Sequence, residues 1–90
     1  MQQVCLTIQG RVQRVFYRAE AQKKALELGL KGFAKNNADG TVTIIAQGAE
    51  ERLKLFIQWC WDGSKLAHVE NIDIRYEEDP AEQYSDFSIS

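Results

Sequence analysis

Cysteine, histidine and proline are scarce in this 90-residue sequence, which has two cysteines, one histidine and one proline. Cys5 and Cys60 have neither the spacing of metal ligands nor the density of a disulfide-stabilised scaffold. Cys5 falls on the polar face of a predicted strand, whereas Cys60 falls on the apolar face of a predicted helix, so we expect no disulfide between them. The single histidine, His68, is interpreted as structural.

The sequence also lacks an excess of positive charge and long apolar runs. Its formal net charge of -2 gives no basic field that would attract a polyanion over a wide surface, so a bound anion must be held by a local site. No apolar run approaches the ~20 residues needed to cross a membrane. The first five residues lack the basic start and the apolar core of a signal peptide. We therefore expect a cytoplasmic protein without membrane or nucleic-acid partners.

Linkers, repeats and low-complexity tracts are absent as well, and 90 residues suffice for one core. We expect residues 1–90 to form a single domain. Alternating apolar residues predict strands, and apolar residues at a helical period predict helices. The expected strands cover residues 3–9, 31–35, 41–47, 67–76 and 85–89, and the expected helices cover 18–28 and a segment from 50 to a stop signal at 62–64.

Two local signals connect these elements into a fold. Asp39 and Gly40 form a strong turn signal, which predicts a hairpin between the second and third strands. In the fourth strand the alternation of apolar residues shifts by one position between Val69 and Ile72, which predicts a bulge near residues 70–71. The order βαββαβ plus a short final strand predicts an α+β, ferredoxin-like sandwich with an antiparallel sheet and two helices on one face.

A polar loop led by glycine, Gly10 to Tyr17, connects the first strand to a helix expected to begin at Arg18. Backbone N–H groups, the positive end of a helix and a guanidinium fork would then meet at one place, which suits a phosphate-like dianion. A cation at a helix N-terminus opposes the helix dipole unless an anion is bound there. The alternative interpretations are that Gly10 to Tyr17 is an ordinary strand-to-helix connection and that Arg18 is an ordinary surface arginine.

Asn36 stands just before the predicted turn. Asparagine is common there because its side chain can bond to nearby backbone. Its amide can also orient a water molecule, because it donates and accepts hydrogen bonds. Both roles are open from the residue alone.

Two motifs in this sequence resemble those of the acylphosphatase family. The first family motif reads Gly-x-Val-Gln-Gly-Val-x-Phe/Tyr-Arg, and the second reads Gly-aromatic-Val/Ala-basic-Asn-x-x-x-Gly-x-Val followed by a further glycine. The sequence matches the first at Gly10, Val12, Gln13, Val15, Tyr17 and Arg18, and the second at Gly32, Phe33, Ala34, Lys35, Asn36, Gly40, Val42 and Gly48. The resemblance covers almost the whole chain.

The resemblance implies hydrolysis of acyl phosphates to a carboxylate and inorganic phosphate, without metal or cofactor. In that family scheme Arg18 would hold the phosphate and Asn36 would position the attacking water. Phosphate or sulfate would be an ionic ligand of the site, and a monomer is expected. The backbone N–H groups that would assist Arg18 are those of Arg11, Val12, Gln13, Arg14, Val15 and Phe16.

Arg14 departs from the family pattern, which usually has glycine at this position. If the position requires a positive φ, a non-glycine residue costs about 1 kcal/mol or more there. Either the loop changes shape and loses an N–H contact, or Arg14 lies outside and adds positive potential at the mouth of the site. The first outcome favours a catalytically weakened anion-binding or regulatory domain.

An RNA-binding module, the other alternative, is disfavoured by the acidic composition and by an open strand face expected to offer Cys5, Thr7, Thr41 and Thr43.

Overall fold

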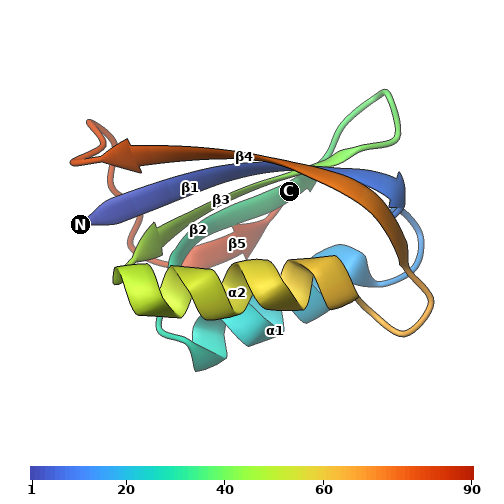
Figure 1. Ribbon diagram of the computed structural model, residues 1–90, viewed down its shortest axis with the longest axis horizontal. Helices are drawn as coiled ribbons and strands as arrows, with labels where there is room; N and C mark the ends of the chain where they lie inside the picture. The colour runs from blue at the N-terminus through green and yellow to red at the C-terminus, as the bar shows by residue number, and fades with distance from the viewer.

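Five strands form one sheet, and both helices pack on the same face of it (Figure 1). The computed structural model describes all 90 residues. Neither helix has the length and apolar character needed to span a membrane. The elements in chain order are β1 (Gln2–Arg11), α1 (Tyr17–Glu27), β2 (Lys31–Asn36), β3 (Val42–Gly48), α2 (Glu50–Asp62), β4 (His68–Glu78) and β5 (Phe87–Ile89).

The strand order is β4-β1-β3-β2-β5, and the predicted ferredoxin-like fold with its hairpin is confirmed. The expected antiparallel pairing is found among β1, β2, β3 and β4, whereas the short β5 pairs with β2 in parallel. Residues 79–86 carry the chain from the end of β4 to the edge where β2 begins (Figure 1). The last strand therefore starts beside the first residues of β2 and runs in the same direction.

The core lies between the helices and one face of the sheet. Val4, Leu6 and Ile8 alternate along β1 and are fully buried, as the sequence pattern predicts. Burying such a side chain contributes about 1.5–3 kcal/mol relative to leaving it exposed. The predicted apolar face of α2 packs on the same core through Leu53, Phe56, Ile57 and Cys60.

The bulge predicted in β4 is confirmed at Glu70. Gln9 lies opposite Asn71 and Gly10 lies opposite Val69, so Glu70 has no partner on β1. Pairing with β4 continues to Arg11, so Gly10 and Arg11 belong to the strand and not to the loop as predicted. Gly10 has a φ of 123°, and a Cβ at this residue would overlap the carbonyl oxygen of His68. Glycine is therefore required by the close approach of two strands.

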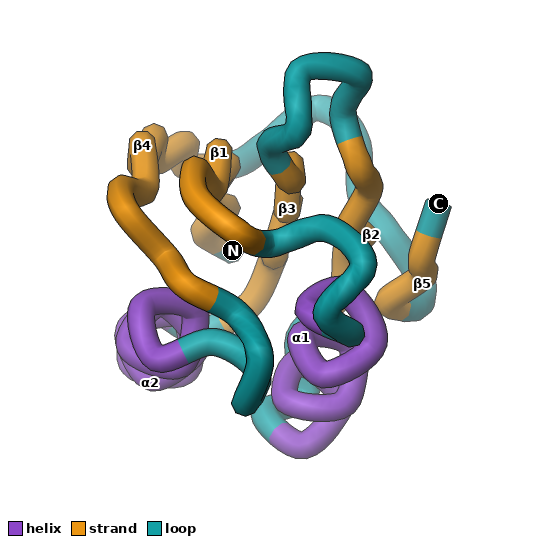
Figure 2. The backbone as a smooth tube through the Cα atoms, turned by 90° about the vertical axis from the view of Figure 1, so that its right-hand side faces the viewer, coloured by secondary structure: helices purple, strands orange, loops and turns teal.

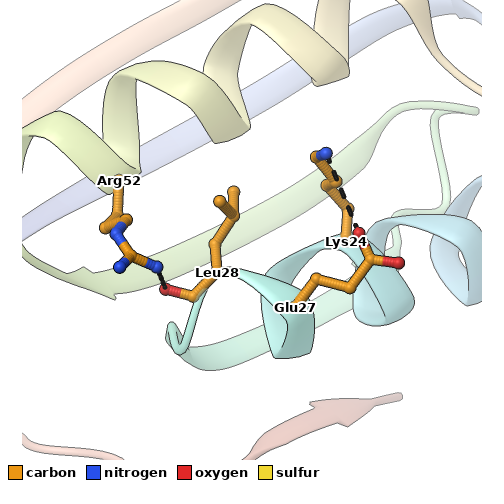
Figure 3. Close-up of polar contacts among 4 residues, drawn as sticks. All are labelled: Lys24, Glu27, Leu28 and Arg52. Carbon is orange, nitrogen blue, oxygen red and sulfur yellow. Dashed lines mark hydrogen bonds and ion pairs between the residues drawn. The ribbon is translucent and has the colours of Figure 1, made fainter.

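The two helices touch where α1 ends. Arg52 of α2 donates a hydrogen bond of 3.4 Å to the carbonyl oxygen of Leu28, the C-cap of α1 (Figure 3). Within α1, Lys24 and Glu27 form an ion pair of 3.8 Å (Figure 3). Both contacts are exposed, and such surface pairs contribute less than about 1 kcal/mol. The helix–helix arrangement therefore depends mainly on the shared apolar core.

The open face of the sheet is partly covered by residues 79–86. Gln47 is fully buried there, since its amide bonds to the Gln3 side chain, the Glu82 carbonyl and the Tyr84 N–H. The expectation for this face omitted Phe33, whose ring packs edge-on against Tyr84 with a centroid separation of 5.6 Å. Because the Tyr84 ring packs against Phe33, the Phe33 ring is not free to stack on an RNA base.

Candidate active site

The loop of residues 12–16 connects the end of β1 to the start of α1, as Figure 2 shows. Val12 and Val15 point into the core, with exposed fractions of 1% and 7%. Arg14 and Phe16 are exposed. The loop therefore presents its two valines inward and its two largest side chains outward.

Arg14 and Phe16 both have a φ of 63°, in the left-handed region. A non-glycine residue in this conformation costs about 1–2 kcal/mol. At Arg14 the backbone adopts the left-handed conformation and the side chain lies outside.

Two tertiary hydrogen-bond anchors hold the 12–16 loop. On the β2 side, Gln13 Nε2 donates to the carbonyl oxygens of Asn37 and Thr41, at 2.8 and 2.9 Å. On the β4 side, Ser64 Oγ donates to the carbonyl oxygen of Val15 at 2.7 Å. These contacts join the loop to the β2–β3 turn and to the segment that precedes β4, which offsets the strain at Arg14 and Phe16.

The backbone N–H groups of residues 12–16 donate no hydrogen bond to any other part of the chain. Backbone donors are strong and are normally paired when they leave water. Five consecutive amides thus have no partner within the protein beside the N-terminus of α1, whose dipole favours an anion.

Arg18 is the second residue of α1, because the helix begins at Tyr17, one residue earlier than predicted. Arg18 is half-buried as a residue, and its Nη1 donates to the carbonyl oxygen of Ser90 just after β5. Arg18 also lines a cavity of about 250 Å³. The other residues of this cavity are Val12, Arg14, Phe16, Tyr17, Ala19 and Ile89.

The electrostatics of this cavity favour an anion. Its lining includes two arginines and no carboxylate, and neither arginine takes part in an ion pair. The hydroxyl of Tyr17 is buried and donates to the Cys60 carbonyl oxygen at 2.8 Å. Burial raises the pKa of Tyr17 far above its usual value and that of the Cys60 thiol to about 12, so both groups are neutral at pH 7.

Asn36 and Asn37 are adjacent in sequence but differ in their contacts. Asn36 is the last residue of β2, and its exposed side chain makes no hydrogen bond within the protein. The Asn37 amide donates to the hydroxyls of Thr41 and Thr43, at 2.9 and 2.7 Å. Asn37 therefore holds the turn together, whereas the Asn36 amide remains free for a water molecule or a ligand.

Not all predicted site residues meet in one place. Val12, Arg14, Phe16 and Arg18 line the 250 Å³ cavity, whereas Arg11, Gln13, Val15 and Asn36 do not. Gln13 reaches the residue after Asn36 and thereby connects the loop to that part of the site. No group of three or more histidine, cysteine, aspartate or glutamate side chains is placed to hold a metal ion.

Sequence reasoning missed the residues that support the site. Ser64 was interpreted only as part of a helix stop signal, although its hydroxyl holds the loop at Val15. Asp39 was interpreted only as a turn residue. Its carboxylate accepts hydrogen bonds from the Thr41 hydroxyl and N–H, which lower the pKa of Asp39. The polar character of these residues was the only local signal.

The fold and the loop define a small α+β protein with unpaired backbone amides and two arginines between its first strand and first helix. A profile of the acylphosphatase family matches residues 4–89. An acylphosphatase of Thermus thermophilus is 47% identical over 79 residues, which cover 88% of this chain and 90% of that protein. One from Shewanella amazonensis is 40% identical and covers 100% of this chain and 98% of its own length.

Among solved structures, the crystal structure of an acylphosphatase from Bacillus subtilis superposes with a TM-score of 0.95. It is 34% identical and covers 100% of this chain and 99% of its own. The chain therefore belongs to the acylphosphatase family of enzymes.

The strain at Arg14 leads to a test of stability. Arg14→Gly is expected to raise the free energy of unfolding by about 1 kcal/mol relative to Arg14→Ala, because alanine retains the left-handed penalty and glycine does not. Both variants lose the positive charge and should bind phosphate more weakly than the wild type. Urea unfolding and phosphate titration measure the two effects separately. Equal stability of the two variants would contradict the assignment of strain to this residue.

Proposed function

We propose that this protein hydrolyses acyl phosphates to a carboxylate and inorganic phosphate without a metal ion, with the phosphate bound by Arg18 and the 12–16 loop. The unpaired N–H groups of that loop, beside a cavity lined by Arg14 and Arg18, are the observation that carries the proposal. Membership of the acylphosphatase family supports the same reaction.

Acyl phosphate chemistry suits a site with so few reactive groups. The leaving group is a carboxylate, whose conjugate acid has a pKa of about 4, so no general acid is required. The transition state is loose, and positioning together with charge stabilisation supplies most of the catalysis. Arg18 and the loop amides would balance the charge of the phosphoryl oxygens, and the substrate phosphate would accept the proton of water.

Asn36 would position the attacking water. Its amide can accept one hydrogen bond from water and donate another, and no protein group competes for it. Because Gln13 and Asn37 fix the turn next to Asn36, the direction of this amide is constrained by its surroundings. Asn36 thus supplies orientation and not proton transfer.

The alternative is an anion-binding or regulatory domain with weakened catalysis, and the arginine at position 14 is the observation that favours it. Phosphate release from acetyl phosphate in EDTA separates the two. We expect multiple turnovers with EDTA present and competitive inhibition by inorganic phosphate. Phosphate binding without turnover by the folded protein would instead favour the regulatory domain, and Arg14→Gly would then show whether that arginine is the cause.

A further inference from the structure

A second cavity of about 360 Å³ is lined by Phe16 and by residues of the segment before β4. Phe16 and Leu66 line it and are the most exposed large apolar side chains in the chain, at 72% and 64%. Exposing apolar surface to water is unfavourable, and exposed apolar groups that line one cavity are typical of a binding site. The remaining residues of this cavity are Val15, Glu20, Ser64 and Lys65.

This second cavity shares Phe16 with the cavity of the proposed phosphate site. Phe16 lines both cavities, with Arg18 on one side and Leu66 on the other. The left-handed conformation of Phe16 turns its ring outward between them. The Ser64 anchor on Val15 fixes the segment before β4 against the same stretch of loop. A ligand bound by the loop amides would therefore have an apolar wall next to it.

The sheet order indicates which part of a substrate would reach this wall. In-line displacement at phosphorus places the attacking water and the leaving oxygen on opposite sides. β2, which ends at Asn36, and β4, which follows Leu66, lie on opposite sides of β1. The 12–16 loop follows β1, so a phosphate bound by this loop lies between the end of β2 and the segment before β4. In-line attack by a water positioned by Asn36 then places the leaving acyl group on the side of Leu66.

We infer that the cavity between Phe16 and Leu66 binds the acyl group of the substrate and selects acyl phosphates with an apolar acyl group, such as an aromatic one. This inference rests on the proposed function. Glu20 and Lys65 have opposite formal charges, so the cavity offers no net charge to an ionic acyl group. Leu66 is then a specificity-determining residue, which acts on the acyl group and not on the phosphate.

The test compares benzoyl phosphate with acetyl phosphate in the wild type and in Leu66→Ala. We expect the ratio of kcat/KM for benzoyl to that for acetyl phosphate to fall about fivefold to tenfold in the variant, as for removal of apolar contacts from a pocket. Leu66→Met, which keeps the apolar contact, should retain the ratio. Leu55→Ala is the matched control, because Leu55 is 51% exposed on α2 and lies outside this cavity.

A binding measurement supports the kinetic one. Phosphonates in which a methylene group replaces the bridging oxygen are inhibitors that do not turn over, and the phenyl compound should lose affinity in Leu66→Ala more than the methyl compound. If the wild type hydrolyses both substrates and the ratio does not change in Leu66→Ala, this inference is wrong and the proposed function stands. If the wild type hydrolyses neither substrate, the proposed function fails and this inference fails with it.

Discussion

Replacing Arg18 by alanine is expected to lower kcat/KM for acetyl phosphate by at least about 1000-fold, because an arginine that stabilises a transferring phosphoryl group typically contributes this much. Arg18 is half-buried beside the unpaired loop amides, so its interaction with an anion is less screened than at an open surface. Inhibition by inorganic phosphate should weaken in parallel. Steady-state kinetics in EDTA measures both effects.

Two further variants separate the effect of the guanidinium of Arg18 from the effect of its charge and from the loss of any surface arginine. Arg18→Lys keeps the charge but loses the planar fork, so it should retain part of the phosphate affinity and little of the turnover. Arg75→Ala removes an exposed arginine from β4, where it lies opposite Cys5 on the open face, and should leave kinetics unchanged. Wild-type turnover in a folded Arg18→Ala protein would exclude Arg18 from the reaction.

Asn36→Ala is expected to lower kcat by about 100-fold, the typical effect of misplacing a reacting group by about 1 Å. Because the proposal assigns Asn36 to the water and not to the phosphate, the inhibition constant of inorganic phosphate should change little. The free energy of unfolding should also stay within about 0.5 kcal/mol of the wild type, since the side chain is exposed and unbonded. Kinetics, phosphate inhibition and urea unfolding measure these quantities.

Asn71→Ala is the control for that prediction. Asn71 is an exposed asparagine of β4 near the bulge, and its replacement should affect none of the three quantities. A parallel loss of phosphate affinity and turnover in Asn36→Ala would assign this residue to phosphate binding and would contradict its role with water.

The fold could be predicted from the sequence where neighbouring residues determine the structure. The Asp39-Gly40 turn, the apolar face of α2 and the parity change that predicts the bulge at Glu70 are all local patterns. The parallel pairing of β5 is not local, because it depends on how residues 79–86 cross from one edge of the sheet to the other. The extension of β1 through Arg11 depends in the same way on its pairing with β4.

The sequence predicts the candidate site residues that stand in motifs, but it does not predict the hydrogen bonds that hold the loop. Arg18 and Asn36 stand in motifs that can be read along the chain, and their roles remain predictions. The Ser64 bond to Val15 joins residues 49 positions apart, and no sequence period marks it. The left-handed conformation of Phe16 has no sequence signal, since phenylalanine does not favour a positive φ, whereas at Arg14 the glycine of the family motif indicates one.

The anchors on Gln13 and Val15 are made entirely by protein groups, so the fold itself fixes the shape of the loop that would receive the phosphate. A glycine-rich loop of the same length would lose more backbone freedom on binding, because each glycine samples more conformations. Here that conformational entropy is lost during folding. Association with a small anion then requires no loop closure, and the affinity for phosphate is set by direct contacts and desolvation. Preorganisation of the loop is the consequence of Gln13 and Val15, which adjoin its two left-handed residues, being held by distant partners.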